Sequence, residues 1–256
     1  MTQTINFSRY TSIKIGPTVE VKVINDPCAY TGEYLIGRGY NLLVSPTPPP
    51  LAILGERYST ISQEGTFLRV GAGVTNAALY RYVKAHNLGG LEFIAKLPGS
   101  VGGMVVMNAG LKEYEIFGAI VGVETIDGYQ PKEEIAYGYR TTNLSRPVLE
   151  VVFDLATPFD VQKEVMFKNM RANQPSAPSA GSCFKNPVGD YAGRLIEAVG
   201  LKGYRVGGMA FSEVHANFLT NEDRGTFEDA ITLISMAKER VLGEFGITLE
   251  LEIKVI

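Results

Sequence analysis

Apolar and polar residues alternate along the N-terminal part of the chain in a way that predicts several short strands. Residues 19–24 (VEVKVI) place an apolar side chain at every second position, the period of a strand with one buried face. Apolar runs at 35–36 and 42–44 flank a glycine-containing turn and predict two more strands. Another strand is expected in LAILG (51–55). The intervening SPTPPP (45–50) excludes a helix or a central strand, because proline lacks the amide donor that both require.

Three stretches carry apolar residues at the three- and four-residue steps of a helix. We expect one helix over 74–87 and an amphipathic helix over 160–172, which ends ahead of a Gln-Pro pair. The third helix begins at a capping box, in which Thr226 accepts from first-turn amides and Asp229 follows three residues on. Gly246 is its expected C-cap. The apolar stripe of this helix comprises Phe227, Ile231, Ile234, Ala237 and Val241.

The remaining patterns add strands and define the fold class. FLRVGAG (67–73) predicts a strand that ends in a glycine-rich turn. Residues 116–126 and 126–130 predict two strands joined by an Asp-Gly turn. The tail at 247–255 alternates strictly and predicts a terminal strand. Strands and helices are mixed without strict β-α alternation, which favours an α+β protein with two or three subdomains.

Composition narrows the class of protein. The chain has 256 residues, 45% of them hydrophobic and 20% charged, as in an ordinary soluble globular protein of enzyme size. A net charge of -3 excludes the basic field that nucleic-acid binding needs. No secretory signal and no apolar run of about 20 residues is present, so we expect a cytoplasmic protein without a membrane span. Cys28 and Cys183 lie far apart without metal-ligand spacing, so neither a disulfide framework nor a metal site is expected.

The stretch LPGSVGGMVVMNAG (97–110) is the richest candidate for ligand binding. Its glycines allow successive amides to turn inward as an anion-binding nest, and Ser100 and Asn108 add polar side chains. The GxxxxGK[ST] loop of nucleotide triphosphatases is absent, and the sequence at 71–73 lacks the third glycine of a GxGxxG fingerprint. A pyrophosphate cradle and a glycine-rich packing turn both remain open at this point.

A second candidate is PSAGSCFKNP (178–187), where a glycine-containing bend crowds short polar side chains together with Phe184 as an apparent anchor. Ser182 is either a loop serine that satisfies backbone groups or a proton-handling group. The neighbouring Cys183 invites a nucleophile reading with His215 as base, but free cysteine is usually buried, and we interpret it as a small packing residue.

Taken together, these stretches resemble a known family. The motifs are GRGYNLLVS (37–45), LPGSVGGMVVMNAG (97–110), YGYRTT (137–142), PSAGSCFKNP (178–187) and LELEI (249–253). In this order and spacing they resemble the UDP-N-acetylenolpyruvoylglucosamine reductases, flavoenzymes of bacterial peptidoglycan precursor synthesis. The resemblance runs from YTSIKIG (10–16) to the C-terminus, and the short distance from Arg140 to Ser182 is similar to that of the compact type II form.

The resemblance implies a two-subdomain FAD-binding region of the vanillyl-alcohol-oxidase (PCMH) type, in residues 1–60 and 61–158. A C-terminal α+β substrate-binding domain would occupy 159–256, with its last strand returning to the active site. FAD would be bound non-covalently and NADPH would be the co-substrate. The cofactor-binding residues implied are Gly37, Gly39, Asn41, Leu42, Pro98, Gly99, Ser100, Gly102, Gly103, Asn108 and Ala109.

The resemblance also assigns the chemistry. Ser182 would protonate the substrate, Arg140 would stabilise the enolate and carboxylate, and Glu252 would assist the enolic intermediate. By periodicity alone Glu250 shares a face with Glu252, and the pattern does not choose between them. The substrate-binding residues implied are Tyr139, Lys185 and Asn186.

Two positions depart from the family pattern. Tyr40 stands where a serine usually follows the second glycine of the first motif, which puts a hydrogen bond to the flavin there in doubt. Asn173 stands where a basic residue is expected to contact phosphate, so that contact would come from Arg171 or Lys185 instead.

The implied reaction is the NADPH-dependent reduction of UDP-N-acetylglucosamine enolpyruvate to UDP-N-acetylmuramate. We expect the protein to be a monomer and to need no metal. One alternative is another FAD-dependent oxidoreductase of the same superfamily, oxidising a small alcohol or sugar. The absence of histidine from 37–45 and 97–110 counts against covalent flavin in that case. A flavin-independent module that binds an anion on its glycine loop is a third possibility.

Overall fold

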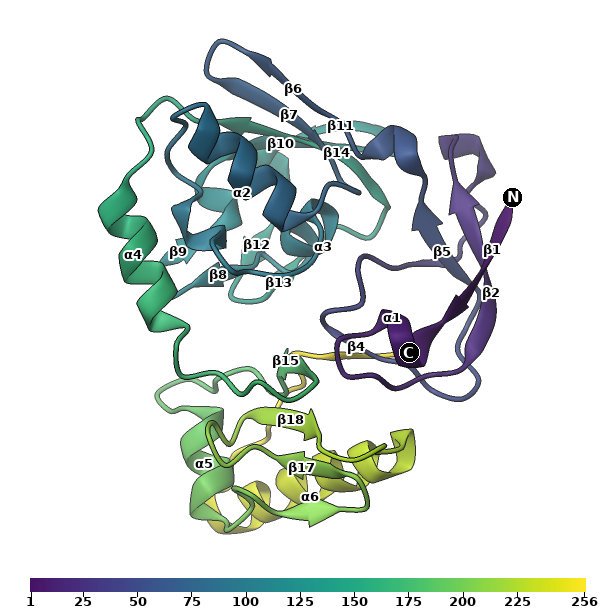
Figure 1. The fold of residues 1–256 in the computed structure, drawn as a ribbon, viewed down its shortest axis with the longest axis vertical. Coiled ribbons are helices and arrows are strands. Elements are labelled where there is room, and N and C mark those ends of the chain that lie inside the picture. The colour runs from purple at the N-terminus through teal and green to yellow at the C-terminus, as the bar shows by residue number, and fades with distance from the viewer. The chain divides into compact units, whose positions relative to one another are not determined.

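The computed structural model describes residues 1–256 and divides into two compact units (Figure 1). Unit 1 consists of Met1–Gln3, Val21–Arg38 and Pro50–Ala172. Unit 2 consists of the remaining segments, Thr4–Glu20, Gly39–Pro49 and Asn173–Ile256. The units group residues by contact and not by role, so the three functional domains expected from the sequence stay a prediction.

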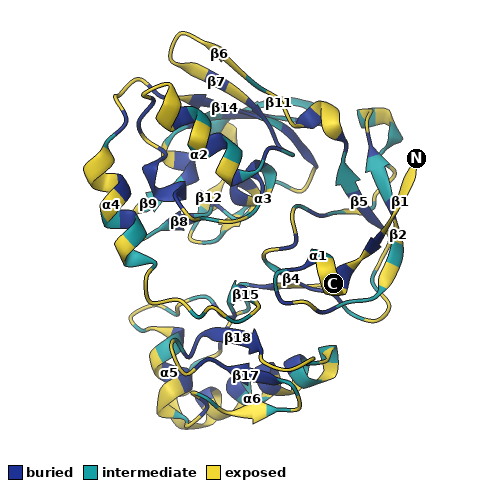
Figure 2. Ribbon diagram, in the orientation of Figure 1, coloured by how far each residue is buried: buried dark blue, intermediate teal, exposed yellow.

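Unit 1 is built on a five-stranded antiparallel sheet with the order β11-β10-β14-β7-β6. The strands are β6 (Ile61–Glu64), β7 (Phe67–Gly71), β10 (Ile120–Thr125), β11 (Gly128–Pro131) and β14 (Val148–Asp154). The predicted strands at 67–73 and 116–130 are confirmed, with the Asp-Gly turn between β10 and β11, while 116–118 form a 3-10 turn. Buried residues from the sheet and from neighbouring helices form one continuous core, dark blue in Figure 2.

Three helices belong to unit 1: α2 (Asn76–Ala85), α3 (Val101–Val106) and α4 (Val161–Met170). The helix expected over 74–87 is confirmed, and it begins two residues later because the side chain of Thr75 accepts from the amide of Ala78 as an N-cap. Helix α3 contacts β14 and β7, so the glycine-rich stretch at its start is attached to the sheet. The short strands of this unit are β8 (Gly110–Leu111), β9 (Tyr114–Glu115), β12 (Tyr137–Gly138) and β13 (Thr141–Thr142).

A smaller sheet has the order β1-β2-β5-β3, from β1 (Thr2–Asn6), β2 (Thr18–Ile24), β3 (Tyr34–Leu35) and β5 (Leu51–Leu54). The strands expected near 19–24, 35–36, 42–44 and 51–55 are therefore present. The two strands that flank the glycine turn do not pair with each other. Strand β3 runs parallel to β5, whereas β4 (Leu42–Leu43) runs parallel to β19 (Lys254–Val255).

Unit 2 holds a four-stranded sheet with the order β15-β18-β17-β16 and two principal helices. The strands are β15 (Ser179–Ser182), β16 (Arg205–Val206), β17 (Met209–Phe211) and β18 (Phe218–Asn221). The helices are α5 (Ala192–Ala198) and α6 (Phe227–Phe245), together with the single turn α1 (Phe7–Tyr10). Helix α6 confirms the predicted capping box and its C-cap, since Thr226 and Asp229 exchange hydrogen bonds and Gly246 is left-handed at φ 67°.

The expected terminal strand over 247–255 is wrong as a continuous element. Leu251 makes one isolated bridge to Phe184, and only β19 pairs further along, with β4. The tail is thus shared between two different partners, with a bend at 252–253, and neither partner is long enough for a full ladder.

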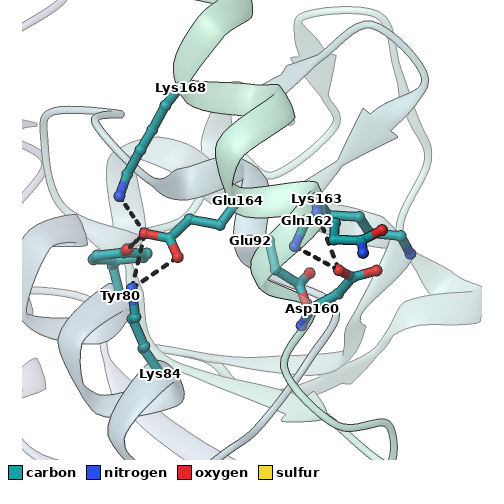
Figure 3. A network of polar contacts seen from close by, with 8 residues as sticks. All are labelled: Tyr80, Lys84, Glu92, Asp160, Gln162, Lys163, Glu164 and Lys168. Atoms are coloured by element: carbon teal, nitrogen blue, oxygen red, sulfur yellow. Dashed lines mark hydrogen bonds and ion pairs between the residues drawn. The ribbon is translucent and has the colours of Figure 1, made fainter.

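Helix α4 is confirmed, but its amphipathic character is wrong. Val161 and Val165 are 58% and 52% exposed, while Glu164 is buried. The reason is an ion network drawn in Figure 3: the Glu164 carboxylate accepts hydrogen bonds from Tyr80, Lys84 and Lys168. The Lys84 Nζ lies 2.7 Å from Glu164 Oε2. A buried carboxylate therefore joins this helix to α2, while Phe167 of the same helix is buried in the core.

A second carboxylate fixes the start of the same helix. The buried Glu92 accepts from the amide of Gly90 at 3.0 Å and from that of Asp160 at 2.9 Å. Asp160 in turn caps α4 by accepting from the amides of Gln162 and Lys163 (Figure 3).

None of the helices combines the length and the apolar composition needed to cross a bilayer.

Candidate active site

In unit 1 the glycine-rich stretch lies against the turn that carries Gly37. A Cβ added to Gly37 would come within 2.7 Å of Ser100 Oγ, so a larger residue there would displace the serine hydroxyl. At Gly103 an added Cβ would meet nothing nearer than Ser100 Oγ at 3.5 Å, which leaves that backbone open. A main chain without side chains above it, beside a buried serine hydroxyl, fits the pyrophosphate of FAD.

The inward-facing amides expected over this stretch are only partly available to a ligand. The amide of Val101 donates to the carbonyl of Val74 and that of Gly102 to Ala72, both at 2.9 Å. These two bonds hold the start of α3 against the preceding turn. An anion would therefore be held by the neighbouring positions, among them Ser100 and Gly103.

Asn76 secures the same loop from helix α2. It is fully buried, its Nδ2 donates to the carbonyl of Pro98 at 2.8 Å, and its backbone amide donates to Gly99 at 3.1 Å. Its Oδ1 is a buried acceptor without a hydrogen-bond partner, the kind of group that a bound ligand or water satisfies.

Unit 1 brings Arg140 to the far end of the glycine-rich stretch. The guanidinium donates to the carbonyl of Gly110 at 2.9 Å, next to Asn108 and Ala109. Asn108 is fully buried, and its Nδ2 donates to Glu115 Oε2 at 2.7 Å and to the carbonyl of Gly138 at 2.9 Å. The side chain of Asn108 thus fixes this turn, and its contribution to cofactor binding would come through the backbone.

Two further residues surround that arginine. Its guanidinium lies 4.9 Å from the centre of the half-exposed Tyr139 ring. Burial, and then the positive charge of Arg140, lower the pKa of Arg171. Two guanidinium groups close enough to repel each other favour an anion in their vicinity.

In unit 2, Ser182 follows a β-bulge. Strand β15 pairs Ser179 with Thr220 and Ser182 with Phe218, so two residues of β15 face a single residue of β18. Gly181, in the bulge, has φ 83°, and an added Cβ there would meet nothing within 4 Å. Glycine is therefore required for its conformation and not for space, and the bulge re-aims the residue that follows it.

The C-terminal segment bonds the residue that follows Ser182, and it places Glu250 and Glu252 in different environments. The amide of Glu252 donates to the carbonyl of Cys183 at 2.9 Å. The Glu250 side chain is 72% exposed and pairs with Lys185 at 2.5 Å, whereas Glu252 is half-buried. The geometry thus favours Glu252, the residue that the family resemblance selects, for a role near the serine.

The other residues expected here have clear positions. Asn41 Nδ2 donates to the carbonyl of Glu252 at 3.1 Å, and Leu42 pairs with Lys254 in the β4–β19 ladder. Asn186 Oδ1 accepts from the amide of Ala192 at the start of α5. Gly39 is buried, and its carbonyl accepts from the amide of Ser12 at 3.0 Å. The exposed Tyr40, the departure in this motif, is 46% accessible.

Cys183 and His215 do not form a nucleophile and base. Cys183 is fully buried, and burial raises the pKa of its thiol far above the usual range. This supports the interpretation of Cys183 as a packing residue.

Sequence reasoning missed Asn217, whose side chain bonds both backbone groups of Phe184. The available signal was an asparagine between the apolar Ala216 and Phe218.

Comparison with known proteins places these features in a family. Residues 51–129 match the FAD binding domain, and residues 173–256 match the C-terminal domain of UDP-N-acetylenolpyruvoylglucosamine reductase. Over 260 residues the chain is 42% identical to the UDP-N-acetylenolpyruvoylglucosamine reductase of Helicobacter hepaticus, covering 100% of this chain and 99% of the relative. Identity to the reductase of Campylobacter jejuni is 43% over 257 residues, covering 98% and 99%.

The fold agrees with a solved structure. The crystal structure of UDP-N-acetylenolpyruvylglucosamine reductase from Thermus caldophilus superposes with a TM-score of 0.88 at 31% identity, covering 100% of this chain and 98% of that one. An FAD-binding region of the PCMH type, a separate C-terminal domain and a mixed α+β fold define a flavin-dependent oxidoreductase.

The two relatives match over nearly the full length of the chain and share one activity. The chain belongs to the UDP-N-acetylenolpyruvoylglucosamine reductase family, whose reaction is a step of peptidoglycan precursor synthesis. The predicted fold class, family and FAD cofactor are thereby confirmed, and the oxidase and the flavin-independent module receive no support.

Proposed function

We propose that the protein reduces UDP-N-acetylglucosamine enolpyruvate to UDP-N-acetylmuramate, with NADPH as electron donor, non-covalent FAD as cofactor and Ser182 as proton donor. The observation that carries the proposal is the bulged strand of unit 2. It places Ser182 directly before a residue whose carbonyl is bonded to the amide of Glu252 at 2.9 Å. We further propose that the protein is a monomer and acts in the cytoplasm.

FAD, held by the backbone around Gly37, Ser100 and Gly103, would supply hydride transfer from NADPH to the vinyl CH2 carbon of the substrate. The electron pair of the substrate double bond then takes a proton at the adjacent carbon, which carries the carboxylate. Ser182 Oγ supplies that proton and regains one from solvent. A serine hydroxyl is a weak acid, so its contribution depends on being held at a fixed position against the developing charge.

Arg140 balances the negative charge that builds up on the carboxylate side of the substrate. Its planar fork can bind a carboxylate through two hydrogen bonds, which the point charge of lysine cannot do. The bond from its guanidinium to the carbonyl of Gly110 holds it beside the backbone of Asn108 and Ala109. Glu252 assists the enolic intermediate. The side-chain amide of Asn41 donates to the backbone carbonyl of Glu252 and holds this residue in place.

The backbone around Gly37, Ser100 and Gly103 would hold the FAD pyrophosphate, supported by Pro98, Gly99 and Gly102. On the substrate side, Arg171 or Lys185 would contact the diphosphate, and Tyr139 and Asn186 would be further contacts. Lys185 is pre-oriented by its ion pair with Glu250.

The test separates the two half-reactions by stopped flow under anaerobic conditions. Ser182→Ala should leave flavin reduction by NADPH within about twofold, and should slow reoxidation by the enolpyruvyl sugar nucleotide by roughly 10²–10⁴-fold. Ser179→Ala, on the same strand ahead of the bulge, is the matched control and should reoxidise at the wild-type rate. Equal losses in both half-reactions would exclude the proton-donor role.

A further inference from the structure

Asn217 lies immediately before strand β18 and is 3% exposed. Its side chain makes two hydrogen bonds to one residue: Oδ1 accepts from the amide of Phe184 at 3.0 Å, and Nδ2 donates to the carbonyl of Phe184 at 2.8 Å. Its own carbonyl accepts from the amide of Cys183 at 2.6 Å. Asn217 thus bonds three consecutive peptide units after Ser182, the first through its backbone carbonyl and the next two through its side chain.

The regular ladder does not fix this segment without Asn217. Strand β15 ends at Ser182, and the bulge at Gly181 has already interrupted its pairing with β18. Beyond it, the C-terminal segment bonds the carbonyl of Cys183 and the amide of Lys185. The amide and carbonyl of Phe184, in between, are both bonded by the side chain of Asn217. An asparagine amide can replace a strand here because it presents one donor and one acceptor side by side.

Asn217 is itself held by His215. The backbone amide of Asn217 donates to His215 Nδ1 at 3.2 Å. Burial lowers the pKa of His215, which keeps the ring neutral and able to accept at this nitrogen. The ring lies against Gly193, where an added Cβ would come within 3.1 Å of it. His215 therefore has a structural role behind Asn217.

We propose that Asn217 is a positioning residue for the reaction, which sets the orientation of the Ser182 hydroxyl through the backbone of Cys183 and Phe184. The inference rests on the proposed role of Ser182. A purely structural role for Asn217, which is 3% exposed, would stabilise unit 2 without changing the rate of substrate reduction. The test therefore needs a control variant that destabilises unit 2 by a similar amount.

Asn221, at the other end of β18, provides that control. It is 7% exposed, its Nδ2 donates to the carbonyl of Ile13 at 3.0 Å, and its Oδ1 accepts from the amide of Gly225 at 2.8 Å. It therefore has the same residue type, similar burial and the same pair of bonds, but its partners lie away from residues 182–185. Asn217→Ala and Asn221→Ala should lower the thermal midpoint by similar amounts.

The decisive measurement is the rate of flavin reoxidation by the enolpyruvyl sugar nucleotide in the FAD-loaded protein. Asn217→Ala should slow reoxidation about 10²-fold, because displacing a reacting group by about 1 Å reduces the rate by about that factor. Reduction of the flavin by NADPH should change by less than about threefold. Asn221→Ala should leave both rates near wild type. In the Ser182→Ala background, Asn217→Ala should have little further effect, since it acts through the serine.

Three results would overturn the inference: normal reoxidation in Asn217→Ala, a parallel loss of both half-reactions matching Asn221→Ala, or an undiminished effect of Asn217→Ala in the Ser182→Ala background. Normal reoxidation in Ser182→Ala itself would refute the proposed proton-donor role of Ser182, on which the inference rests. If Asn217→Ala does not fold, Asn217→Asp goes through the same measurements. It keeps the acceptor for the Phe184 amide and loses the donor to the Phe184 carbonyl.

Discussion

The ion network of Glu164 allows a quantitative prediction for the variant Glu164→Gln. Burial raises the pKa of this carboxyl, but the hydrogen bonds from Lys168, Lys84 and Tyr80 outweigh it and lower the pKa from 4.5 to about 2. One pKa unit corresponds to about 1.4 kcal/mol, so the charged carboxylate contributes about 3 kcal/mol to the free energy of unfolding at pH 7. The glutamine variant should lose that amount.

The pH dependence follows from the direction of the shift. A carboxyl whose pKa is lowered by folding contributes its full stability above pH 4.5 and loses it as the pH falls toward about 2. The gap between wild type and Glu164→Gln should therefore shrink from about 3 kcal/mol at pH 7 to roughly 1 kcal/mol at pH 3. Contributions from all other carboxyls cancel in this difference.

Chemical denaturation at a series of pH values measures the gap, and hydrogen exchange of the α4 peptide locates the change in unit 1. The exposed Glu64→Gln, in the same unit, is the matched control and should leave stability within about 0.5 kcal/mol. A gap that is the same at pH 7 and pH 3 would show that the network stabilises α4 through packing and not through charge.

Further expectations concern the cofactor side, the arginine and the buried histidine. Arg140→Lys keeps the charge but loses the two-pronged donor, so substrate reduction should fall by about 10-fold or more in steady-state assays, and wild-type turnover would argue for a surface role. Gly37→Ala places a Cβ 2.7 Å from Ser100 Oγ and should weaken FAD binding in a fluorescence titration, while Gly118→Ala, with nothing within 4 Å, should not. Burial lowers the pKa of His215 below its usual 6.5, so an NMR titration should show the ring protonating below pH 6.5. The free energy of unfolding should decrease as the pH falls through that range. A ring that titrates at or above pH 6.5 would contradict this.

Features that depend on neighbours in the chain were determined by the sequence alone. The capping box of α6 and its glycine C-cap need only residues within a few positions, and both were predictable from Thr226, Asp229 and Gly246. The family and its FAD cofactor were likewise readable, because the motifs that carry them are continuous stretches of backbone-defining residues such as 97–110.

What required the tertiary structure were the contacts between residues distant in the chain. The sequence around Glu164 does not predict that Tyr80 and Lys84 will bond its carboxylate. Its burial was therefore not expected from the amphipathic pattern of α4. The tail alternates like one strand, yet its hydrogen bonds are divided between residues near Cys183 and Asn41. Asn217 matters through Phe184, 33 positions away. Local periodicity records which side of an element is buried, but only the folded chain decides which partner buries it, since that choice depends on loop closure and on hydrogen bonds that no short segment contains.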